Sequence, residues 1–93
     1  MNLKNLKFQN TEMPKGIQAI LKFGDHELSI VKSDFSYGGK QGLYEIAVFK
    51  DSTQIEMPGI TQEGDTVKGF LNESDVDVII KKMHIATGSS PSQ

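Results

Sequence analysis

Residues 17–32 read IQAILKFGDHELSIVK, and this stretch decides the fold. Apolar side chains stand at every second position from Ile17 to Phe23, which is the period of a strand with one buried face. Gly24 and Asp25 follow as a dipeptide suited to a type II′ turn, because glycine accepts positive φ at the first corner. A shorter apolar alternation comes after the turn. The stretch therefore predicts a β-hairpin, with strands over 17–23 and 26–32.

Further strands are expected after this hairpin. Residues 43–50 read LYEIAVFK and are apolar on both faces, which is typical of a strand in the middle of a sheet or beneath a helix. Residues 51–52 resemble a turn into a short fourth strand over 53–57, which Pro58 and Gly59 end. The segment 58–69 holds three glycines and two acids, so we expect a loop there.

One helix is predicted near the C-terminal end. Asn72 is a good N-cap, and Asp75 stands three residues later, as in a capping box. Gly88 and Pro91 prevent continuation of the helix. We expect a helix over 73–84 with one apolar stripe, made by Val76, Ile79, Ile80 and Met83. The whole pattern predicts an α+β fold, in which an antiparallel sheet of three or four strands carries one C-terminal helix packed across it.

The two ends of the chain differ in composition from this domain. Residues 1–16 end in Met-Pro-Lys-Gly, whose proline and glycine separate them from the strand that follows. We expect an N-terminal extension or an edge strand that uses Leu3, Leu6 and Phe8. The α+β domain is expected over 17–86. The tail 87–93 has no apolar side chain able to dock, so we expect it to be disordered.

Composition excludes several functions. With no cysteine among 93 residues, disulfides, thiolate zinc sites and thiol nucleophiles are excluded. All ten basic residues are lysines and the net charge is −2, so we expect neither nucleic-acid binding nor attraction to membranes. No apolar run has transmembrane length, and the first ten residues are too polar for a signal peptide. These absences favour the cytoplasm.

No pattern of catalytic residues is present. His26 follows the hairpin turn and His84 lies late in the helix, without partners at metal-ligand spacing, so we expect surface histidines. The acids lie mostly in loops or at the helix start, where capping and solubility explain them. We therefore predict a protein that is not an enzyme and that has no cofactor and no metal.

The loop 33–42 is the most unusual segment. Its glycines would let backbone N–H groups approach a phosphate, and Lys40 adds charge. A phosphate-binding P-loop, however, places Ser or Thr after the lysine and then a helix, whereas here Gln41 and a strand follow. Two interpretations stay open. The loop is a structural connection with its aromatics folded back on the sheet, or it is a binding site made by Phe35, Tyr37, Gly38, Gly39 and Lys40.

Two short motifs carry a resemblance. The first is Ser-Tyr-Gly-Gly at 36–39, followed by Gly-Leu-Tyr-Glu at 42–45, and the second is Gly-Phe-Leu-Asn-Glu-Ser-Asp-Val at 69–76. Over roughly 19–83 the chain resembles a family of small, functionally uncharacterised proteins encoded by bacteriophages and prophages. The resemblance implies an accessory protein that acts in the cytoplasm of a bacterial host, and it carries over no catalytic residue.

The function expected from these observations is binding. We predict a small non-enzymatic accessory protein, with no membrane contact, that docks on a host or phage protein through the loop 33–42. The alternative is a small-ligand binder, such as a nucleotide sponge, that uses the same loop around Lys40. The sequence predicts no oligomeric state.

Overall fold

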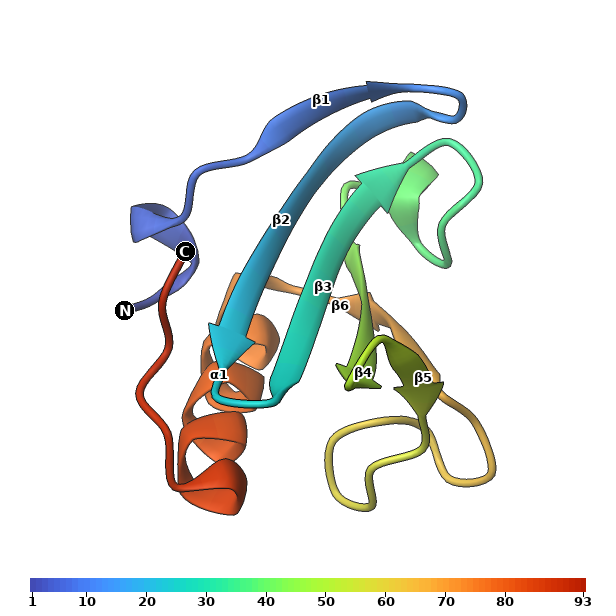
Figure 1. Cartoon of the computed structure of the whole chain (residues 1–93). Helices are drawn as coiled ribbons and strands as arrows, with labels where there is room; N and C mark the ends of the chain where they lie inside the picture. Colours follow the sequence, from blue (N-terminus) through green and yellow to red (C-terminus); the bar gives the residue numbers. More distant parts are fainter.

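Six strands form one antiparallel sheet around a central strand (Figure 1). The computed structural model describes all residues from Met1 to Gln93. Along the sheet the order is β1-β2-β3-β4-β5, and β6 also pairs with β4. The strands are β1 (Gln9–Glu12), β2 (Lys15–Phe23), β3 (His26–Ser33), β4 (Tyr44–Lys50), β5 (Thr53–Ile55) and β6 (Val67–Leu71). The α+β class is confirmed, but the prediction of three or four strands was too low.

The hairpin of β2 and β3 forms the longest strand pairing in the sheet. Phe23 pairs with His26 across a two-residue turn, in which Gly24 has a φ of 66°. In β3, Ile30 lies opposite Ala19 of β2 on one side and opposite Ile46 of β4 on the other. The expected central position of β4 is confirmed, since β3 covers one of its edges while β5 and β6 share the other edge.

Two strands have sequences that lack a strand pattern, so the edge strand expected within 1–16 was placed on the wrong residues and β6 was missed. β1 is composed of Gln, Asn, Thr and Glu, and it is a strand because its backbone pairs with β2. β6 lies partly in the segment 58–69 that was expected to be a loop, and Lys68 and Gly69 interrupt its apolar pattern. Its pairing with β4 places Val67 opposite Ala47, twenty positions away, which no local pattern indicates.

The predicted helix is confirmed as α1 (Glu73–Thr87), although it is three residues longer than expected. The Asn72 side chain accepts a hydrogen bond from the Asp75 amide, and the Asp75 carboxylate accepts one from the Asn72 amide. This reciprocal pair is the capping box. Gly88 ends the helix in a left-handed conformation, with a φ of 70°. All four residues of the apolar stripe are buried, namely Val76, Ile79, Ile80 and Met83.

The core lies between α1 and one face of the sheet. It includes Leu3 and Leu6 near the start of the chain, beside a short 3-10 turn, η1 (Leu3–Asn5). The Leu3 amide donates a 2.6 Å hydrogen bond to Asp77 Oδ1 on the helix. The edge strand therefore begins after Phe8 rather than including Leu3, because both leucines are drawn into the core.

The C-terminal tail is placed on the sheet edge, in contrast to the expected disorder. From the end of α1 it returns beside the helix to the N-terminal segment (Figure 1). Ser92 exchanges two backbone hydrogen bonds with Lys22, of 2.8 and 2.9 Å, and the Gln93 side chain bonds both backbone polar groups of Lys7. Backbone and amide hydrogen bonds, rather than apolar docking, hold this tail.

The opposite face of the sheet has no helix over it. Register places Ala47 and Phe49 of β4 on this outer face, where both are half-buried. Ile20 of β2 shares the same face and is 43% exposed. The apolar residues on the second face of β4 are therefore partly covered by neighbouring strands of the sheet, not by a helix. No helix in the structure has the length and apolar character that crossing a bilayer requires.

Candidate functional site

The loop after β3 is a tightly bonded connection. Ser36 Oγ accepts a 2.9 Å hydrogen bond from the Ser33 amide and donates a 3.0 Å bond to the Ser33 carbonyl oxygen. A second short 3-10 turn follows, η2 (Gly39–Gln41). The Leu43 amide then donates to the Gly38 carbonyl, at 2.9 Å, before β4 begins. These bonds hold the loop in one shape and direct its side chains.

Of the five predicted site residues, the two glycines pack within the loop and the other three have exposed side chains. Gly38 is buried, with a φ of 88°, and Gly39 packs so closely on Ser33 that a Cβ there would overlap the Ser33 carbonyl oxygen. Phe35 is 82% exposed, so it is not folded back on the sheet, whereas Tyr37 is 60% exposed and contacts β6. Lys40 is exposed on η2.

Tyr37 stacks on a residue from a distant part of the chain. Its ring centroid lies 6.5 Å from that of Phe70 on β6, and the ring planes make an angle of 27°. The Phe70 amide donates a 3.1 Å hydrogen bond to the Tyr37 carbonyl oxygen. Phe70 is itself 58% exposed. The three exposed aromatic residues of the chain, Phe35, Tyr37 and Phe70, thus belong to this loop and to the strand that meets it. We call these three residues the aromatic patch, in which Tyr37 and Phe70 are the pair in ring contact.

The backbone is strained where it presents Phe70. Its φ of 58° lies in the left-handed region, which is a genuine outlier for a bulky residue and costs on the order of 1–3 kcal/mol. The preceding Gly69 lies against Tyr37, because an added Cβ there would lie 2.3 Å from Tyr37 Cβ. The pairing of β4 and β6 is irregular at this point, between Tyr44 and Ile46.

A shallow hollow of about 260 Å³ adjoins the stacked rings. Asp65 and Lys68 are the charged residues among those that line it. Glu45 also lies beside the patch, since its Oε2 accepts a 3.3 Å hydrogen bond from the Tyr37 amide, and Asp34 precedes Phe35 in the loop. Two carboxylates and one lysine thus lie at this border, while Asp34 and Lys40 of the loop carry opposite charges. The full lining is Tyr37, Gln62, Asp65, Val67, Lys68, Gly69 and Phe70.

Sequence reasoning missed Phe70 as a site residue. The Gly-Phe-Leu motif was noted as part of the resemblance, but its phenylalanine had no assigned role. An expected loop over 58–69 gave no reason to place residue 70 beside Tyr37. Only the antiparallel pairing of β6 with β4 brings the two aromatics together.

The histidines lie apart from this patch. His84 is exposed on α1, whereas His26 is largely covered, with a side chain 15% exposed and its Nδ1 2.8 Å from Asp25 Oδ1. His26 is thus not the surface residue that was expected, because β3 holds it between β2 and β4. No group of three or more His, Asp or Glu side chains is arranged to hold a metal ion.

No family model matches the chain, and no curated protein or solved structure is detectably similar to it. The residues and their geometry are therefore the basis for a functional proposal.

Proposed function

We propose that this is a non-enzymatic binding protein that docks on a partner protein through the aromatic patch Phe35, Tyr37 and Phe70. The observation that carries the proposal is the strained, exposed stack of Tyr37 and Phe70. Core packing does not account for the strain, because both rings remain more than half exposed. Strained conformations of this kind persist where the surroundings enforce them, and they cluster at binding sites.

The chemistry of the patch suits a protein surface. Exposed aromatic side chains supply large contact area at small entropic cost, and tyrosine is enriched among interface hot spots. The carboxylates of Glu45 and Asp65 border the rings, against Lys68. We therefore infer a partner segment that presents an arginine or lysine beside apolar side chains, since such a cation can lie over an aromatic face. The resemblance to phage-encoded proteins extends the proposal to a host or phage protein as partner.

Capture from bacterial lysate with matched variants tests this proposal. Phe70→Gly removes the ring and places the residue type that tolerates positive φ best, so the fold should be retained. If Phe70 is a hot spot, capture should weaken by roughly thirtyfold, the equivalent of about 2 kcal/mol. Tyr37→Ala should act in the same direction. The control is Ile85→Ala, which removes an apolar side chain that is 73% exposed on α1, outside the patch.

Melting curves of all variants accompany the capture measurement. Lost capture with an unchanged melting temperature supports the patch as the interface. Full capture by both ring-removed variants would reject it. A partner displaced by lysine-rich competitor peptides would support the inferred cationic segment, whereas a partner indifferent to them would overturn that part of the proposal.

A further inference from the structure

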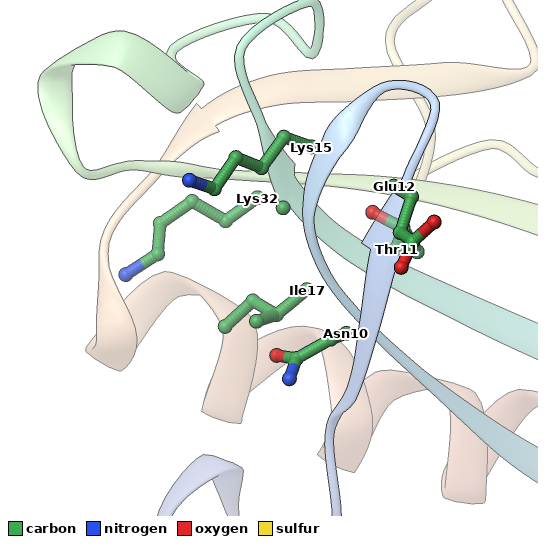
Figure 2. Close-up of a pocket in the computed structure, with 7 residues that line it drawn as sticks. Asn10, Thr11, Glu12, Lys15, Ile17 and Lys32 are labelled. Carbon is green, nitrogen blue, oxygen red and sulfur yellow. The ribbon is translucent and has the colours of Figure 1, made fainter.

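A second surface feature lies at the opposite end of the sheet from the β2–β3 turn, beneath the β1–β2 hairpin (Figure 2). It is an open groove of about 660 Å³. Ala19 and Ile30, a buried cross-strand pair, face the core, and Ile17 and Lys32 form the next pair on the same face. The groove thus continues the core-side face of the sheet. Its lining residues are Asn10, Thr11, Glu12, Lys15, Gly16, Ile17 and Lys32.

Two lysines share this groove. Lys32 lies opposite Ile17, and Lys15 stands two positions from Ile17, so the lysines are diagonal neighbours across β2 and β3. Long side chains reach one another at that spacing. Figure 2 shows both lysine side chains extending to the same side of the hairpin. The Lys32 ammonium lies 5.0 Å from the centre of the Tyr44 ring, which positions it by a cation–π contact.

No carboxylate forms an ion pair with either lysine. The one close contact between a carboxylate and a basic side chain joins Asp25 and His26, at the far end of the hairpin. Glu12 lies directly opposite Lys15 across β1 and β2 and also lines the groove, but it forms no ion pair with either lysine. Two like charges at this diagonal spacing repel each other, although solvent screens the repulsion. An anion bound between the lysines would remove that repulsion.

We propose that this groove binds a small organic phosphate. A phosphate group would lie between Lys15 and Lys32, because the lysine ammonium is a compact point charge suited to phosphate. The Asn10 amide lies at the same groove and can donate a further hydrogen bond. The groove is far larger than a phosphate ion and within the size range of small-molecule sites. Ile17 supplies an apolar surface for the remainder of the ligand.

This site is separate from the aromatic patch and from Lys40, so its test is independent of the proposed function. The probes are inorganic phosphate and phenyl phosphate, titrated into the full chain and followed by amide chemical shifts. We expect phenyl phosphate to bind more tightly than phosphate, with shifts centred on Lys15, Gly16, Ile17 and Lys32. Lys15→Gln and Lys32→Gln should each weaken binding about five- to tenfold.

Two further variants make the test decisive. Lys40→Gln makes the same charge change on η2 and should leave the affinity unchanged. Glu12→Gln removes the carboxylate that competes with the ligand and should tighten binding about twofold or more. Equal weakening by Lys15→Gln and Lys40→Gln would show general charge attraction and would overturn the site. Shifts confined to other residues, or no binding of either probe at 10 mM, which is about the weakest affinity of interest, would also overturn it.

Discussion

Substitution of Gly69 by alanine gives the sharpest test of how the aromatic patch is built. Gly69 does not have positive φ, so alanine is acceptable to its backbone and would ordinarily stabilise the chain slightly. The obstacle is steric, since the new Cβ would lie 2.3 Å from Tyr37 Cβ, whereas ordinary contacts begin at 3.4 Å. Because Tyr37 Cβ is fixed to the backbone, the loop and β6 must separate by about 1 Å.

That separation sets the expected cost. It would break the hydrogen bond from the Phe70 amide to the Tyr37 carbonyl, which contributes about 0.5–1.5 kcal/mol. It would also disturb the ring stack, which contributes about 0.5–1.5 kcal/mol. We therefore expect Gly69→Ala to lower the free energy of unfolding by about 1–3 kcal/mol. For a domain of this size, each kcal/mol corresponds to a fall of about 4–8 °C in melting temperature.

A double-mutant cycle in urea separates the contact from other effects. Tyr37→Gly deletes the atom that the new methyl group would meet, so Gly69→Ala should cost much less in that background. A coupling of about 1 kcal/mol or more is expected between the two changes. The close approach of Gly69 to Tyr37 is wrong if Gly69→Ala has the melting temperature of the wild type. It is also wrong if Gly69→Ala lowers the free energy of unfolding equally in the wild-type and Tyr37→Gly backgrounds.

Three further predictions concern stability. Ile80→Ala should cost about 2–5 kcal/mol in chemical denaturation because Ile80 lies on the buried side of α1, while Ile85→Ala, at an exposed position, should stay within about 0.5 kcal/mol. Asn72→Ala should cost about 1 kcal/mol by removing the helix cap, and Asn72→Asp, which preserves the cap, should melt close to the wild type. Deletion of residues 89–93 should lower stability by about 1–2 kcal/mol through loss of the Ser92 bridge, and an unchanged melting curve would show that the tail does not hold the sheet edge.

The elements predicted well are those whose signals are local. The β2–β3 hairpin is encoded by alternation around a glycine turn, and α1 by a capping residue, an apolar stripe and a terminal glycine. Each signal needs neighbours within a few positions of the chain, so it is visible without knowledge of the fold. The aromatics of the loop 33–42 are exposed, and the role of this loop in binding stays a prediction.

The sequence by itself determined the class of fold, its central hairpin, its helix and the side of the helix that enters the core. The tertiary structure decided the rest. β1, β6 and the Ser92 bridge exist because backbone groups find partners far along the chain, and backbone hydrogen bonding leaves little trace in side-chain pattern. The stack of Tyr37 on Phe70 and the diagonal pair of Lys15 and Lys32 follow from strand register, which only the folded sheet defines.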